Sequence, residues 1–440
     1  MMNKLLLIGS LFICQLINGK VNGQDITAAK LPGLFNAHRS KTVTEKIYVH
    51  TDKEYYLAGE TVWFKLYNVD GVLHKPISIS KLAYVEILNA GKVPVMQAKI
   101  KLGEGSGHGS LQLPHTLASG NYILRAYTGW MKNFDADFYF EKNIAVLNTL
   151  SEEPIELAGK DSVDYDIQFF PEGGNLVSEL GGKLAFRVVD KSGKGVDFKG
   201  AILDQKGDTV VLFSPLFKGI GSFSFLPSKG TSYQAVLTVP GNRKIIKDLP
   251  QVYETGYSLR VVNEAQRLLV KVQSRTAEPD EVLNLFVHTR GGAPMLLQGS
   301  LKDNLLQFWI DKDSLREGIS HITLFNNKMQ PLCERLFFKP FKKKLTLSAV
   351  SDSKIYSTRK KVTINIETKD ETAAGVSSDL SLSVFHKDAG NSAPAIDIQT
   401  YLHLTSDLKG NIEDPAYYFS DTSGNVTDAL DNLMLTQGWR

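Results

Sequence analysis

Cysteine is scarce in this chain, and its scarcity excludes stabilisation by disulfides. The 440 residues contain two cysteines, Cys14 and Cys333. Because Cys14 falls in a segment that we expect to be removed on export, Cys333 would be the only cysteine of the mature chain, and no intrachain disulfide could form. We therefore expect stability to come from packed cores. Cys333 itself is predicted to be a small buried side chain of a strand at 332–338, in preference to a reactive thiol.

An excess of charge of one sign is also lacking. The 50 Lys and Arg residues almost balance the 47 Asp and Glu residues, which gives a net charge of +3. A nucleic-acid-binding protein needs a concentrated basic surface, and no long basic run occurs, so we expect no nucleic-acid partner. After the N-terminal segment, no stretch approaches the roughly 20 apolar residues that a membrane-spanning helix needs. We therefore predict no transmembrane segment in the mature chain.

Motifs that carry known catalytic chemistry are missing as well. There is no Gly-x-Ser-x-Gly with a following helix and no His-Glu-x-x-His. The glycines of 103–109 resemble a phosphate-binding loop, but no helix pattern follows, so we expect a mobile hairpin connection. We predict a chain that is not an enzyme, with no catalytic residues, no cofactor and no metal.

Three features could suggest a ligand site, and for each the structural interpretation is preferred. His288 and His321 lie in predicted strands, where scattered histidines usually have structural roles. Residues 421–428 are rich in side-chain oxygens. A calcium site must assemble six or more oxygen ligands, however, and the glycine of this stretch is displaced from its place in an EF-hand loop. We expect a solvated turn there.

The first 23 residues have the pattern of a secretory signal peptide. Lys4 precedes an apolar run at 5–17, and small and polar residues follow before Gln24. The chain is therefore predicted to be exported. Leu-Phe-Ile-Cys at 11–14 suggests a lipoprotein motif, but Ile13 is branched where processing needs a small residue. Lipidation at Cys14 stays open.

The clearest strand pattern lies in Ile47–Tyr67. In its second half, apolar residues alternate with the period of two that is typical of a strand with one buried face, and Gly59 supplies the bend before it. Sequence 352–366 repeats this stretch 300 residues later, which indicates that one structural unit recurs. We expect Val62, Phe64 and Leu66 to be buried opposite Tyr122, Leu124 and Ala126, with Trp63, Lys65 and Tyr67 pointing outwards. The repeated positions are Asp352, Tyr356, Val362 and Ile364, which match Asp52, Tyr56, Val62 and Phe64.

The residues around Asp52 and Gly59 resemble the signature strand pair of macroglobulin domains, the β-sandwich modules of the alpha-2-macroglobulin and complement family. The resemblance implies an all-β fold built as a tandem array of immunoglobulin-like antiparallel sandwiches. The family's thioester motif has no match, because Cys333 is followed by Glu334, Arg335 and Leu336. The segments that carry the resemblance are Thr51-Asp52-Lys53, Tyr56, Gly59–Val62, Gly120–Ala126, Phe170–Gly174 and Glu334–Phe338.

The combination of Phe170–Gly174 with Met434–Arg440 is most similar to bacterial envelope proteins whose macroglobulin domains precede the plug of a TonB-dependent receptor. The sequence contains no plug, and whether it is part of a longer plug-containing protein stays open. The predicted organisation is a signal peptide at 1–23, a leader arm at 24–43 and macroglobulin-like domains at 44–148, 163–250, 253–340 and 345–440. The last domain is expected to contain a regular strand at 380–385 and an irregular insertion at 387–428.

Two classes of function follow from the resemblance. The preferred one is a non-enzymatic binding or spacer module of the periplasm or outer membrane of a Gram-negative bacterium, associated with a TonB-dependent receptor. The alternative is a macroglobulin-like endopeptidase inhibitor that acts without a thioester. Both would use a protein partner, a receptor or a protease. In either case we predict that the insertion is exposed to proteases near Lys387 and Lys409.

Overall fold

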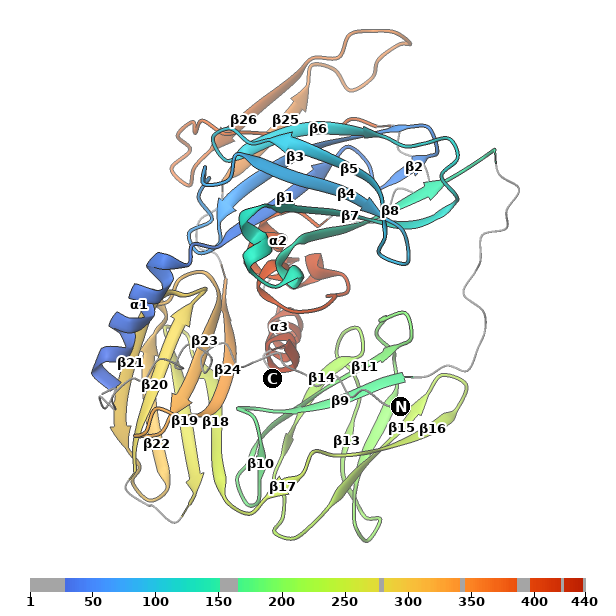
Figure 1. Cartoon of the computed structure of the whole chain (residues 1–440). Helices are drawn as coiled ribbons and strands as arrows, with labels where there is room; N and C mark the ends of the chain where they lie inside the picture. The colour runs from blue at the N-terminus through green and yellow to red at the C-terminus, as the bar shows by residue number, and fades with distance from the viewer. Residues whose placement is uncertain are drawn as a thin grey trace, which may run out of the picture.

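Antiparallel strands dominate the computed structural model, and in the described residues they form three two-sheet sandwiches around a helical segment (Figure 1). The fold class is therefore all-β, as predicted. No helix in this part of the chain combines the length and the apolar character that a membrane span requires. The structure describes residues 28–150, 165–276, 281–340, 345–385, 396–420 and 423–437.

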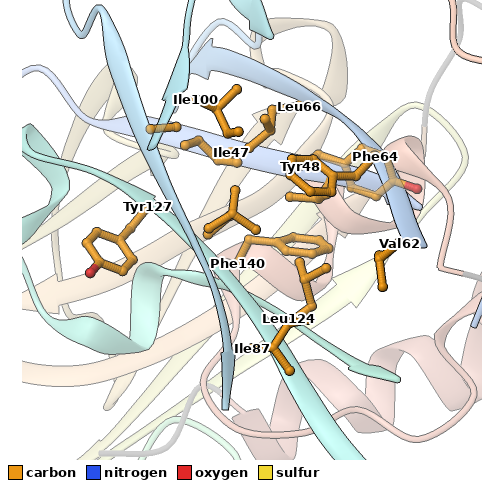
Figure 2. Close-up of a cluster of buried hydrophobic side chains, with 14 of the residues drawn as sticks. Ile47, Tyr48, Val62, Phe64, Leu66, Ile87, Ile100, Leu124, Tyr127 and Phe140 are labelled. Carbon is orange, nitrogen blue, oxygen red and sulfur yellow. The ribbon is translucent and has the colours of Figure 1, made fainter. Parts of the chain in front are cut away.

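The first sandwich packs the sheet β1-β3-β6 against the sheet β2-β8-β7-β4-β5. Phe64 from β3 meets Leu124 from β7 in the core between them (Figure 2). Val62 and Leu66 are also buried, whereas Trp63 is 61% exposed, so the predicted assignment of faces is confirmed. The elements are β1 (Glu45–Thr51), β2 (Tyr55–Leu57), β3 (Thr61–Asp70), β4 (Leu82–Leu88), β5 (Pro94–Lys101), β6 (Ser106–Gln112), β7 (Gly120–Thr128), β8 (Phe140–Leu147) and the short 3₁₀ helices η2 (Trp130–Asn133) and η3 (Ala136–Phe138).

The glycine-rich stretch 103–109 is not the mobile hairpin connection that we expected, because its second half belongs to β6. A Cβ atom on Gly107 would lie 2.6 Å from the carbonyl oxygen of Lys101, and one on Gly109 would lie 2.6 Å from the side chain of Ile100. The glycines therefore let β6 approach β5 and the core closely.

The second sandwich packs β14-β11-β9 against β13-β12-β15-β16, and the third packs β18-β19-β22 against β21-β20-β23-β24. Cys333 lies in the core of the third, where burial raises the pKa of its thiol to about 12, so its predicted burial in a strand is confirmed. The second contains β9 (Tyr165–Pro171), β10 (Leu176–Val177), β11 (Gly182–Asp190), β12 (Lys199–Asp204), β13 (Thr209–Phe213), β14 (Ile220–Phe225), β15 (Tyr233–Val239), β16 (Arg243–Asp248) and β17 (Val252–Tyr253). The third contains β18 (Gly256–Asn263), β19 (Arg267–Arg275), β20 (Val282–Thr289), β21 (Gly292–Ser300), β22 (Leu305–Asp311), η4 (Lys312–Ser314), β23 (Gly318–Phe325) and β24 (Pro331–Lys339).

The predicted leader arm contains a helix that covers part of the third sandwich (Figure 1). The elements are η1 (Ala28–Lys30) and α1 (Leu31–Lys41), and α1 lies against β21. The Phe35 ring is 5.1 Å from that of Phe286 and 4.9 Å from that of His288, measured between centroids. Apolar contact with the third sandwich thus holds a helix in the segment that we predicted as a leader arm.

After the third sandwich the structure departs from the expected fourth sandwich at 345–440. Its described residues form a two-stranded sheet, β25 (Thr346–Ser351) with β26 (Ile364–Lys369), and then helices. The regular strand expected at 380–385 is not formed, since no neighbouring strand completes its hydrogen bonds there. The expected insertion 387–428 is largely helical where it is described. The helices are α2 (Ile398–His403), η5 (Thr405–Asp407), η6 (Pro415–Phe419) and α3 (Gly424–Gln437).

Candidate functional site

The candidate site is the helical segment, defined here as residues 396–420 and 423–437, which lies where the three sandwiches meet (Figure 1). At its start, α2 docks on the first sandwich. The Tyr401 ring lies 5.7 Å from that of Tyr48 and 5.1 Å from that of Phe140. The Tyr48 hydroxyl donates a hydrogen bond to the carbonyl oxygen of Ile396 at 2.8 Å. The side chain of Asp397 caps the N-terminus of α2 by accepting from the backbone N–H of Thr400.

At the other end of the segment, α3 packs between the second and third sandwiches. Leu430, Leu433 and Met434 recur on one face of the helix and are buried, which confirms the helical spacing expected at these positions. They share a core with Ile220 from β14 and Phe338 from β24. Apolar burial on both sides therefore fixes α3 in place.

A buried network of charges joins α3 to both sandwiches. The Arg335 side chain, from β24, is 2% exposed and that of Glu172, after β9, is 1% exposed. The guanidinium Nε donates to Glu172 Oε1 at 3.2 Å, and an Nη donates to Asp431 Oδ1 of α3 at 2.5 Å. Lys183 of β11 donates to the other carboxylate oxygen of Asp431 at 2.8 Å. The network therefore contacts the second sandwich, the third sandwich and α3 together.

The pKa shifts of Arg335 and Asp431 agree with an ionised pair. Burial by itself would lower the pKa of Arg335, but the carboxylates of Asp431 and Glu172 outweigh it, and the pKa is raised. Burial by itself would raise the pKa of Asp431, but Arg335 and Lys183 hold it below its ordinary value. Arg335 and Asp431 thus each depend on their partners for charge, since an unpaired buried charge is strongly destabilising.

Two segments that carry the macroglobulin resemblance meet at this network. Glu172 belongs to Phe170–Gly174, and Arg335 to Glu334–Phe338. The backbone N–H of Glu334 donates to the carbonyl oxygen of Gly173 at 3.1 Å. Gly173 has φ of +84°, and a Cβ atom there would lie 2.9 Å from the carbonyl oxygen of Leu259. Glycine is therefore needed where the second and third sandwiches touch.

A second charged junction holds α2 and η5 against the first and third sandwiches. Lys46 of β1 donates to Asp407 Oδ1 at 2.5 Å. The rings of His74 and His403 meet edge to face, with centroids 4.8 Å apart. Arg290, after β20, donates to the carbonyl oxygen of Val72, at 3.4 Å, on the loop that carries His74.

Both histidines at this junction are held neutral. Burial, followed by the positive charges of Lys46 and Arg290, lowers the pKa of His74 to about 2. Burial and Arg290 likewise lower the pKa of His403 to about 4, although the nearby carboxylates of Glu317 and Asp407 oppose the shift. Docking of α2 therefore favours the uncharged imidazoles.

The residues predicted to be exposed to proteases are not brought together by the structure. Lys387 lies outside the described residues. Lys409 sits in the turn between η5 and η6 with its side chain 64% exposed, 3.9 Å from Asp135 and 3.8 Å from Asp137 of the first sandwich. Leu408 and Ile412 beside it are buried. In the described part of the segment, exposure around Lys409 is therefore confined to a short turn.

The residues considered as ligand candidates, His288, His321 and the stretch 421–428, lie in or next to regular secondary structure where they are described. His288 and His321 are paired across β20 and β23, with stacked rings 5.0 Å apart. Of the oxygen-rich stretch 421–428, residues 421–422 lie outside the described residues, and the remainder leads into α3. Among the described residues, no cluster of three or more His, Cys, Asp or Glu could hold a metal ion. Sequence reasoning missed the Glu172–Arg335–Asp431 network, although an arginine within the apolar strand 332–338 is a signal of a buried partner.

Comparison with known proteins does not assign this chain to a family. No family model matches the sequence, and no curated protein matches it. Among solved structures, Escherichia coli alpha-2-macroglobulin activated by porcine elastase has 13% identity and a TM-score of 0.26, covering 75% of this chain and 33% of that one. Dimeric latent PorU from Porphyromonas gingivalis has 11% identity and a TM-score of 0.29, covering 67% and 33%. A tetra-tandem repeat from the extending region of a large adhesion protein has 11% identity and a TM-score of 0.20, covering 76% and 92%. This chain thus spans about a third of the length of the macroglobulin and of PorU. These TM-scores are too low to support an argument, so the all-β fold class of this chain rests on its own strand topology.

Proposed function

We propose that this chain is a non-enzymatic binding and spacer module of the Gram-negative cell envelope, exported to the periplasm or outer membrane and associated with a TonB-dependent receptor. The observation that carries the proposal is that the buried charges connect structural elements to one another. Arg335, Glu172 and Asp431 fasten sandwiches and α3 to one another. Such a frame suits a protein that holds a partner at a fixed distance.

The association with a receptor is supported by the resemblance of Phe170–Gly174 and Met434–Arg440 to envelope proteins that precede a receptor plug. The structure adds a physical reason for the first segment, which joins two sandwiches and so sets their relative orientation. A fixed orientation lowers the entropic cost of presenting two binding surfaces to one partner. We therefore propose the fixed geometry of the frame as the basis of function.

A reconstitution experiment tests this function. The mature chain is mixed with detergent-solubilised outer membranes of its own source, bound proteins are identified by mass spectrometry, and the best receptor candidate is purified and titrated. We expect a complex of fixed stoichiometry that survives size-exclusion chromatography. The variant Arg335→Ala should weaken the complex because it loosens the frame, and Arg260→Ala, an exposed position on β18, serves as control. Failure of every purified receptor candidate to bind would contradict the proposal.

The inhibitor alternative is favoured by one observation, the exposed turn at Lys409 within an otherwise packed segment. A single cut there would break the chain between α2 and α3, and in a protease trap such a cut would trigger a rearrangement. Trypsin that co-elutes with the cut chain and has lost activity would favour this alternative, and Lys409→Gln should abolish the effect. Trypsin that leaves fully active would support the spacer function.

A further inference from the structure

The connection between β25 and β26 repeats the connection between β1 and β3, shifted by 300 residues. β25 pairs with β26 in the register that β1 has with β3. Because the strands on both sides are in the same register, the two connections can be compared position by position. They are residues 52–61 in the first sandwich and residues 352–361 in the later sheet, and we call the second of these the basic turn.

The same side-chain contact holds both connections in shape. In the first sandwich the Tyr56 hydroxyl donates a hydrogen bond to Asp52 Oδ1 at 2.7 Å. In the basic turn the Tyr356 hydroxyl donates to Asp352 Oδ1 at 2.5 Å. The two turns therefore share one framework, and what distinguishes them lies in their other residues.

The two turns carry opposite charge. Residues 52–61 contain three acidic residues and one basic residue, whereas residues 352–361 contain four basic residues and one acidic residue. In the first turn Lys53 Nζ donates to Glu60 Oε2 at 2.8 Å, but in the basic turn Lys360 takes the position of Glu60. The basic residues are Lys354, Arg359, Lys360 and Lys361, and none of them forms an ion pair within the described part of the chain.

Arg359 occupies a backbone conformation that favours glycine. Its counterpart Gly59 has φ of +89°, and Arg359 has φ of +65°. A side chain is strained in this left-handed region. The first turn also lacks room for one, because a Cβ atom on Gly59 would lie 2.3 Å from the His115 ring. In the basic turn the position is exposed, so the turn keeps its backbone shape and gains a positive charge there.

The exposure of the basic turn does not depend on what packs against the β25–β26 sheet. The first sandwich shows the same positions in a complete two-sheet sandwich, and there the side chains of Glu54 and Glu60 are 35% and 39% exposed and Tyr55 is 39% exposed. Their counterparts in the basic turn are therefore surface positions with or without a covering sheet. The counterpart of Tyr55 is Ile355, which is 85% exposed, and Figure 1 places β25 and β26 at the outer edge of the molecule.

We propose that the basic turn binds the anionic surface of a lipid membrane, with its four cations on the phosphate headgroups and Ile355 inserted between them. Clustered Lys and Arg side chains are attracted to an anionic leaflet, and an apolar side chain beside them adds burial at the boundary of the acyl chains. The turn lies at the outer edge of the molecule, so a flat and extended surface can reach its cations together. A soluble polyanion would neutralise the cations but has no apolar layer for Ile355.

Co-sedimentation of the mature chain with vesicles tests the charged part of the contact. The probes are mixed vesicles of phosphatidylglycerol and phosphatidylcholine, and vesicles of phosphatidylcholine alone. We expect binding to the anionic vesicles only, and we expect it to weaken as salt is added, because salt screens exposed charges. The pair Lys360→Glu with Lys361→Glu should lower the affinity at least about 25-fold, since each basic residue near an anionic surface contributes about fivefold.

The matched control for this pair is Lys244→Glu with Lys247→Glu on β16. It makes the same change in net charge at exposed positions of the second sandwich, and it should leave the affinity close to that of the unchanged chain. All four positions are on the surface, so the circular dichroism spectra should agree. A difference between the two pairs therefore reports the place of the charge and not its total.

Ile355→Ser tests the apolar part of the contact without a change in charge. It should lower the affinity at least about tenfold, because an isoleucine side chain no longer leaves water on binding. Ile246→Ser, at a position of β16 that is 63% exposed, is the matched control and should bind as the unchanged chain does.

Three results would overturn the proposal. These are a chain that does not bind anionic vesicles even at low salt, an equal loss of affinity in the two charge-reversed pairs, and an affinity that Ile355→Ser leaves unchanged. The last result would indicate a soluble polyanion or an acidic protein as the partner of the turn. The proposal is independent of receptor binding, because the vesicles contain no protein and the reconstitution above can succeed or fail whatever their outcome.

Discussion

Glu172 and Arg335 form an ion pair whose two side chains are almost completely buried, although 163 residues separate them in the sequence. The pair joins the second sandwich to the third, and Asp431 extends it to α3. We predict that Arg335→Ala lowers the free energy of unfolding by about 3 to 5 kcal/mol, because it leaves buried carboxylate charge uncompensated. Urea denaturation measures the loss, and amide exchange in β24 locates it. Arg260→Ala is the control, and a loss equal to that control would contradict the structural role.

Asp431 is the part of the network whose loss should release α3 alone. We predict that Asp431→Asn weakens the docking of α3 by about 1.5 to 3 kcal/mol, the range for hydrogen bonds to charged groups. Amide exchange in 424–437 should therefore speed up while exchange in the three sandwiches is unchanged. Asp428→Asn, at an exposed position of the same helix, should have no such effect. Equal exchange in the two variants would show that apolar contacts alone hold the helix.

The core of the first sandwich gives a test of the two faces of β3. Phe64 is 5% exposed and Trp63 is 61% exposed. We predict that Phe64→Ala lowers the free energy of unfolding by about 3 to 5 kcal/mol, the range for a large core aromatic. Trp63→Ala should cost less than about 0.5 kcal/mol, as is usual for an exposed side chain. Thermal and urea denaturation of both variants measure the difference, and a reversed order would contradict the observed faces.

The docking of α2 should depend on pH through His403. Its pKa is about 4 in the docked structure, below the ordinary 6.5, so docking favours the neutral ring. The stabilisation is therefore complete above pH 6.5 and is lost as the pH falls towards 4. Amide exchange in 398–407 between pH 7 and 4 measures it. The charged and titratable groups around the ring are Lys46, His74, Arg290, Glu317 and Asp407.

The variant His403→Gln separates this effect from general acid unfolding. It removes one of the two titrating rings, so the change in exchange between pH 6.5 and 4 should become smaller, and the remainder is due to His74, whose pKa is about 2. The contribution of Asp431 lies in a lower window, because its pKa is held below the ordinary 3.8 and its stabilisation is lost only as the pH falls through that lowered value. An unchanged profile in His403→Gln would contradict the assignment.

Local periodicity was sufficient to predict the strands of the first sandwich and the buried face of α3. Val62, Phe64 and Leu66 alternate, and Leu430, Leu433 and Met434 recur at helical spacing, so in each case the pattern lies within a few neighbouring residues. The repeat at 352–366 predicted a second strand pair, which the structure reproduces in the same register.

What the sequence did not reveal depends on contacts between distant segments. A macroglobulin-like start at 345 predicted a complete sandwich, but the strands that would cover its face are not formed in the described residues. The polar residues and glycines of 387–428 indicated an irregular insertion, yet packing against three sandwiches orders the described part as helices. Helix α1 was missed for the same reason, since Phe35 gains its stability from the third sandwich.

The exposed turn at Lys409 predicts the outcome of limited proteolysis. Its side chain is 64% exposed, and the turn includes Gly410, so trypsin should cut there before it cuts at buried basic residues such as Arg335. Because α2 and α3 are held by separate junctions, the two halves of the segment should stay bound after the cut, and the chain should elute from size-exclusion chromatography as one particle. Lys409→Gln should remove this cut and leave other sites unchanged. Elution of a free C-terminal fragment after the cut would show that α3 depends on the continuous chain and that the buried charges of Arg335 and Asp431 are too weak to hold it.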